Sequence, residues 1–132
     1  VALRRYITRK MQLSREHRFG SKVWANEVMH GAPIIQDYLE STLREWTESR
    51  VAVIRRWSAS GAIQPVEPRW LLYMIWATTQ HYADFAHQIE TLNHGPLSDA
   101  QWQEATETVC GIILRGIGLN AGGTTGSVVA DT

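Results

Sequence analysis

The side chains best suited to ligand chemistry lie close together on one predicted helix. Trp76 and Gln80 are four residues apart, so both project from nearly the same helical face. The carboxamide of Gln80 offers a donor and an acceptor on one planar edge, and an indole packs well against flat rings. A flat ring with a carbonyl group beside an N–H could pair with Gln80 while it stacks on Trp76.

Helical geometry places Tyr73 and Thr79 next to this pair, and the four residues form the candidate ligand-binding set. A purely structural alternative stays open. In that alternative Gln80 bonds a backbone group or crosses a dimer contact, and Trp76 is an ordinary core residue. Helical periodicity alone favours the structural alternative, so the ligand hypothesis needs further support.

The segment from Pro68 to Glu90 must hold these side chains in place. It reads as one helix that is apolar on nearly every face at its start, so we expect it to be buried by its own domain and by a second subunit. Polar residues interrupt the apolar surface from Thr78 to His81. Buried polar groups cost free energy unless something pairs with them. A buried helix whose apolar surface is interrupted by a short polar stretch predicts a small-molecule pocket.

No catalytic or metal-binding pattern competes with this prediction. The common nucleophile, phosphate-loop, dinucleotide and zinc-protease motifs are absent from the sequence. His81, Asp84 and His87 follow steps of three, which leaves the two imidazoles roughly 120° apart on a helix. We therefore expect no metal, no cofactor and no catalytic residue. A small helical enzyme that uses His81 or Asp84 remains a distant third possibility.

Composition narrows the class of protein. Lys plus Arg and Asp plus Glu both number 13, so the chain lacks the net positive charge with which proteins grip a phosphate backbone. Cys110 is the single cysteine, which excludes an internal disulfide and suits a reducing compartment. The longest apolar run is shorter than the roughly 20 residues that cross a bilayer. We expect a cytoplasmic protein with no membrane partner.

The patterning predicts an all-α fold. Capping residues and glycines bound the expected helices, which run from about residue 1 to 17, after Ser21 to 29, from Pro33 to Gly61, from Pro68 to Leu92 and from Ser98 to about 118. The clearest local signal is Ser98 with Gln101, a capping box, which Leu97 and Trp102 flank as a hydrophobic staple.

The two ends of the chain differ from the helical body. Residues 119–132 are rich in Gly, Thr and Ser without periodicity, and we expect a flexible tail after a domain of residues 1–118. The first helix starts at Val1 without a capping residue. Native helices seldom begin so abruptly, which leads us to expect a further segment upstream.

One segment carries a specific family resemblance. The runs Met74-Ile75-Trp76-Ala77 and Thr79-Gln80-His81-Tyr82-Ala83-Asp84-Phe85-Ala86 closely resemble the C-terminal domain of TetR-family transcriptional repressors. More narrowly, they are similar to the pyrimidine-responsive regulators of pyrimidine utilisation in that family. Weaker similarity reaches back to Val1, so the resemblance covers nearly everything except the tail.

The resemblance implies a function and an assembly. It implies a TetR-type helical domain whose last two helices pair with their mates in a homodimer, as a four-helix bundle. It also implies that Trp76 and Gln80 contact a pyrimidine such as uracil or thymine, while operator DNA is read only by an absent N-terminal helix-turn-helix domain. The expected function is therefore effector binding and dimerisation in a transcriptional regulator. The alternative is a helical homodimerisation module without a small-molecule ligand.

Overall fold

A computed structural model describes residues 2–119 of the chain, and all regular structure within that range is helical. This confirms the predicted all-α class. In chain order the elements are α1 (Ala2–Glu16), α2 (Arg18–Met29), α3 (Gln36–Tyr38), the π-helical turn η1 (Leu39–Leu43), α4 (Arg44–Ser60), α5 (Pro68–Asp84), α6 (Ala86–Leu92) and α7 (Asp99–Gly116).

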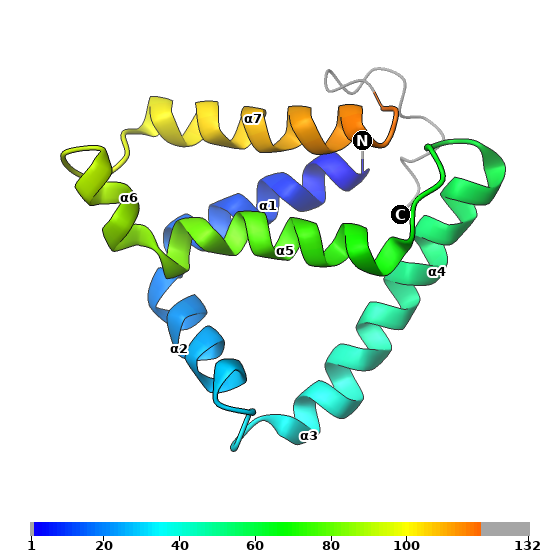
Figure 1. Cartoon of the computed structure of the whole chain (residues 1–132), viewed down its shortest axis with the longest axis horizontal. Coiled ribbons are helices and arrows are strands. Elements are labelled where there is room, and N and C mark those ends of the chain that lie inside the picture. The colour runs from blue at the N-terminus through cyan, green and yellow to red at the C-terminus, as the bar shows by residue number, and fades with distance from the viewer. Residues whose placement is uncertain (1, 120–132) are drawn as a thin grey trace.

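Helix α5 lies at the centre of the arrangement. It contacts α1, α2, α4 and α7, and α1 also packs on α7 (Figure 1). From the end of α1, helix α2 descends to a tip, from which α3, η1 and α4 return toward the start of α5. The outline is triangular, with α5 as one side and two arms below it. The first arm is α2, and the second consists of α3, η1 and α4. The space between the arms and α5 is where the candidate site lies.

The core forms where α1, α5 and α7 meet. Its apolar side chains recur at helical spacing, and they include Leu3, Ile7 and Met11 of α1, Leu71, Leu72 and Ile75 of α5, and Val109, Cys110 and Ile113 of α7. Burial raises the pKa of the Cys110 thiol, which therefore packs as a small apolar group and is a poor nucleophile.

The boundary between the first two helices differs from the sequence prediction. We expected the first helix to end near residue 17 and the second to begin after Ser21, but α2 already begins at Arg18. The chain bends at His17, where the backbone N–H of His17 still donates to Leu13 and that of Ser21 to the carbonyl of His17. Because the helical hydrogen bonds continue, the helix bends without stopping. The Ser21 hydroxyl is used elsewhere, on Asp84 of α5.

The third predicted helix starts three residues late and contains an irregular turn. Pro33 lies in a turn, and the carboxylate of Glu27 accepts the backbone N–H groups of Ile34 and Ile35 at 2.5 and 3.0 Å. The helix begins at Gln36, passes through η1 and continues as α4. Gly61 ends it with a φ of 82°, as predicted, because glycine adopts this left-handed conformation without steric cost.

The fourth predicted helix is divided. We expected one helix from Pro68 to Leu92, but the backbone of Phe85 leaves the helical region, with φ −113° and ψ 29°, and separates α5 from α6. The N–H of Phe85 still donates to His81, and the N–H of Ile89 still donates to Phe85. The apolar periodicity therefore runs through the bend, which is why the sequence pattern does not reveal it.

The capping box before α7 is confirmed. The Ser98 hydroxyl accepts the N–H of Gln101 at 3.1 Å, and the Gln101 side chain accepts the N–H of Ser98 at 2.9 Å. The same Gln101 amide pairs with Asn93, at 2.8 and 3.1 Å. These bonds fix the sharp turn between α6 and α7 that the sequence 93–96 predicts.

The predicted tail falls at residues 119–132, and all of it after Leu119 lies outside the described residues. Within residues 2–119, none of the helices combines the length and apolarity that a bilayer crossing requires.

Ser98→Ala should lower the free energy of unfolding by about 1 kcal/mol, because it removes the helix N-cap of α7. Urea unfolding measures the change. Ser49→Ala is the matched control, since Ser49 is exposed within α4 and bonds only its own helix; its effect should stay within about 0.5 kcal/mol. Equal effects of the two substitutions would contradict the capping role.

Candidate functional site

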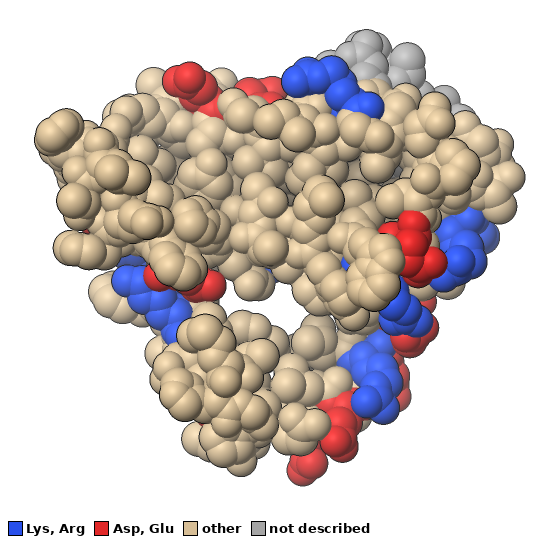
Figure 2. All heavy atoms as spheres, viewed as in Figure 1, with Lys and Arg blue, Asp and Glu red and all other residues tan. Residues whose placement is uncertain are grey.

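A cavity of about 780 Å³ lies between α5 and the two arms of the fold. The volume falls within the range of roughly 300–1,000 Å³ that is typical of small-molecule pockets. Figure 2 shows the opening on this face, below α5 and between the arms. The lining residues come from α1, α2, the α3–η1–α4 arm and α5, and include Tyr6, Lys10, Ser14, His17, Ser21, Trp24, Thr42, Trp46, Trp76 and Gln80.

Trp76 belongs to an aromatic cluster on the cavity wall. Its indole N–H donates to the hydroxyl of Tyr6 at 2.7 Å, which joins α5 to α1. The ring of Trp46 from α4 lies 6.4 Å from Trp76 and 6.1 Å from Tyr6, between ring centroids. Since the indole N–H is already bonded, Trp76 offers the cavity its ring surface and not a donor.

Gln80 lies one turn further along α5 and also lines the cavity. Its carboxamide makes no hydrogen bond with any other group in residues 2–119. Both the donor and the acceptor of this amide are therefore available to a molecule in the cavity. The structural alternative from the sequence, an amide tied to the backbone of its own chain, does not match the geometry of the described residues.

Thr79 and Tyr73 do not line this cavity. Thr79 is fully buried, and its hydroxyl donates to the carbonyl of Ile75 at 2.8 Å. The carbonyl of Thr79 accepts the Ser14 hydroxyl at 2.7 Å, which fastens α1 to α5. Tyr73 packs on the outer side of Trp76, with ring centroids 5.5 Å apart. The structure thus places Trp76 and Gln80 together on the cavity wall, whereas the other two candidates do not line the cavity.

Lys10 is the charged side chain that the sequence analysis overlooked. It lies on the cavity wall and is partly buried. It forms no ion pair or hydrogen bond within residues 2–119. Burial lowers the pKa of its ammonium group, and the charge of Asp84 opposes that shift in part.

The sequence does carry a signal for the residues of α1 that line the cavity. Tyr6, Lys10, Leu13 and His17 follow the spacing of one helical face, and all four line the cavity. The arm residues Trp24 and Trp46 belong to similar helical faces, since Trp24 follows helical spacing with Ser21 and Val28, and Trp46 with Leu39 and Leu43. They reach the cavity because of how the arms fold back, which a single sequence does not reveal.

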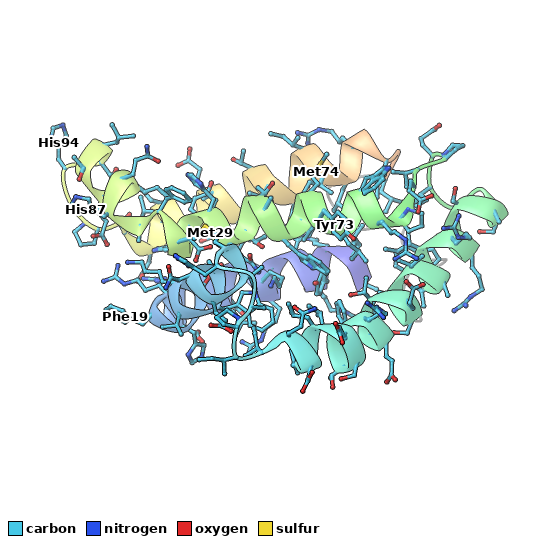
Figure 3. The ribbon with its side chains drawn as sticks, turned by 60° about the horizontal axis from the view of Figure 1, so that its bottom comes forward. Phe19, Met29, Tyr73, Met74, His87 and His94 are labelled. Carbon is cyan, nitrogen blue, oxygen red and sulfur yellow. The ribbon has the colours of Figure 1, made fainter. Side chains whose placement is uncertain are left out.

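The histidines and acids of α5 and α6 form no metal site. Within the described part of the chain, no group of three or more His, Cys, Asp or Glu side chains is placed to hold an ion. His81 stacks on Phe85 with ring centroids 4.9 Å apart. Asp84 accepts the Ser21 hydroxyl at 2.6 Å, and His87 lies beyond the bend on α6 (Figure 3).

Tyr6→Phe should leave the Trp76 N–H without its acceptor and lower the free energy of unfolding by about 1–2 kcal/mol. Thermal unfolding measures the loss. Tyr73→Phe is the control, because the Tyr73 hydroxyl bonds no other group among residues 2–119. A stability loss of the same size in both variants would argue against the Trp76–Tyr6 hydrogen bond as the cause.

Comparison with known proteins assigns the domain. Residues 1–120 match a TetR C-terminal family described as the C-terminal region of YcdC-like proteins. The chain is also 38% identical, over 118 residues, to the "HTH-type transcriptional regulator RutR" of Escherichia coli K12 and of Shigella flexneri. That alignment covers 89% of this chain and 56% of the relatives, so the chain spans about half of their length. The family is one of transcriptional regulators and not of enzymes, in agreement with the sequence analysis. The chain belongs to the YcdC-like C-terminal domains of the TetR family.

Proposed function

We propose that this domain binds a pyrimidine base such as uracil or thymine and thereby controls a TetR-type DNA-binding domain. The observation that carries the proposal is the free carboxamide of Gln80 beside the ring of Trp76, in a cavity of about 780 Å³. The resemblance of the surrounding α5 sequence to pyrimidine-responsive regulators supports the same ligand.

The geometry suits a flat ring with alternating donors and acceptors. Gln80 pairs with an N–H and an adjacent carbonyl in two hydrogen bonds, as a side-chain amide does with a nucleobase edge. The indole of Trp76 packs on the face of the ring. Because the described residues leave both groups available, the ligand does not need to displace an existing hydrogen bond of either one.

The proposed full-length protein adds a helix-turn-helix domain, for which the name of the relatives provides support. Two such domains must lie about one DNA turn apart, roughly 34 Å, to enter successive major grooves. A ligand that binds one arrangement of the dimer more tightly than the other shifts the population toward that arrangement. Operator binding then changes because the two arrangements differ in affinity for the ligand.

Two hydrogen bonds supply a route for this coupling. Trp76 donates to Tyr6, and Ser14 donates to the carbonyl of Thr79, so α1 is tied to the helix that carries the candidate ligand contacts. A ligand that moves the Trp76 ring therefore acts on α1. In the proposed full-length protein, α1 leads to the DNA-binding domain.

Dimerisation is the second part of the proposal. Met74 of α5 and Ile112 of α7 are 57% and 63% exposed, although both are large and apolar. In Figure 3, Met74 lies on the edge of the α5 ribbon nearer α7 in that view. We place the four-helix bundle on this face, where α5 and α7 of two copies would bury a standard interface of about 1,200–2,000 Å².

The alternative function is dimerisation without a ligand. The exposed apolar side chains of α5 and α7 support dimerisation under either function. The cavity favours the sensor, because a module that serves only to dimerise has no need of a hollow lined by an amide that bonds no group in residues 2–119.

Gln80→Ala should weaken uracil binding by about 1–3 kcal/mol, because it removes the paired amide. Titration calorimetry measures the affinity. Gln88→Ala on α6 is the control, since Gln88 is exposed and does not line the cavity. Unchanged affinity in Gln80→Ala would remove Gln80 from the site.

The double variant Met74→Asp, Ile112→Asp should raise the dimer dissociation constant roughly a hundredfold or more, since charges buried in an apolar interface are costly. Light scattering over a concentration series measures it. The control is Phe19→Asp, Val23→Asp on α2, where both residues are apolar and at least as exposed as Met74 and Ile112 but belong to another helix. A wild-type monomer at micromolar concentration would contradict the bundle.

A further inference from the structure

Among the described residues, the wall of the cavity carries one ammonium group that forms neither an ion pair nor a hydrogen bond. Lys10 has no ion pair or hydrogen bond within residues 2–119. The neighbouring cations of the same region are engaged, because Arg15 pairs with Asp99, and Arg18 with Glu90 at 2.8 Å. Lys10 therefore stands out as a cation that the fold itself leaves unsatisfied.

The nearest relevant acid does not satisfy it. Asp84 influences Lys10 electrostatically, but its carboxylate accepts the Ser21 hydroxyl at 2.6 Å and does not line the cavity. Burial meanwhile lowers the pKa of Lys10, so the charged form is already at a disadvantage. An oxygen acceptor inside the cavity would offset that cost.

The other lining groups make the cavity rich in donors. No carboxylate is among its lining residues. The hydroxyl of Tyr6 accepts from Trp76 and keeps its own O–H free to donate. Gln80 can accept one N–H of a ligand and donate to one carbonyl, so a second carbonyl oxygen on the ligand would still lack a donor. Lys10 is placed on the same cavity to provide it.

We propose that Lys10 is a specificity-determining residue that donates to a second exocyclic oxygen of the ligand, so that the site selects rings with two carbonyl groups. This inference rests on the proposed function, because it takes Gln80 to pair with the first carbonyl group and its adjacent N–H. Lys10 thereby distinguishes uracil and thymine, which carry two carbonyl groups, from cytosine, which carries one.

The assignment is tested by a double-mutant cycle in which substitutions in the protein are combined with sulfur-for-oxygen replacements in the ligand. Uracil, 2-thiouracil and 4-thiouracil are titrated by calorimetry into the full-length wild type, Lys10→Met and Gln80→Ala. Sulfur is a weak acceptor, so each thio-analogue removes one strong oxygen contact. Comparing the variants separates that lost contact from the larger size of sulfur, because the size penalty is the same in each.

We expect Lys10→Met to weaken uracil binding about 10- to 100-fold, as the loss of a charge-assisted hydrogen bond does. One thio-analogue should lose less than about threefold on the same substitution, because its sulfur faces Lys10. The other should lose as much as uracil does on this substitution. It should also lose less than uracil on Gln80→Ala, because only its N–H contact with Gln80 remains to be removed. Lys10→Arg keeps the charge and should retain most of the preference.

The matched control is Lys22→Met on α2, where Lys22 contacts the ring of Phe19 and does not line the cavity; uracil affinity should stay unchanged. If Lys10→Met weakens uracil and both analogues equally, or none of them, the assignment of Lys10 is wrong while the proposed function stands. If the wild type fails to bind uracil, the proposed function and the inference both fall. Thermal unfolding of Lys10→Met checks that the variant is folded.

Discussion

The packing of α5 on α1 is the contact on which the rest of the structure depends. One side of α5 fills the core with Leu72 and Ile75, and the adjoining side borders the cavity through Trp76 and Gln80. A helix with two such different sides needs a fixed rotation about its own axis. The bond from Ser14 to the carbonyl of Thr79 fixes it from α1, at a buried position where an unpaired polar group would be costly.

This constraint explains why the cavity can stay open. Apolar interiors are normally close-packed, so a hollow needs walls whose parts hold one another in place. Tyr6, Trp46 and Trp76 line the cavity themselves, and their contacts join three different helices. The α2 arm is tied to α5 by the bond from Ser21 to Asp84. The cavity wall is thus held by polar contacts and by aromatic packing within the wall.

Local signals predicted the helical class, the cap at Ser98 and the shared helical face of Trp76 and Gln80, because each depends on residues within one or two turns. The bend at Phe85 escaped detection since the helical hydrogen bonds and the apolar pattern run through it. Lys10 shares a helical face with Tyr6 and Leu13, but the cavity that this face borders forms only when α2 and α4 fold back. Thr79 is buried and does not line the cavity: a threonine at this spacing turns either toward the cavity or toward the core, and only the tertiary packing decides which.

The π-helical turn Leu39–Leu43 has a consequence for the wall that follows it. Such a turn holds one residue more than regular α-helical winding, and turns of this kind often occur at functional positions. Removing that surplus residue would rotate every later position of α4 by about 100°. Trp46 would then leave the cavity wall, although its own identity had not changed. The composition of this wall is therefore set by chain length as much as by side-chain identity.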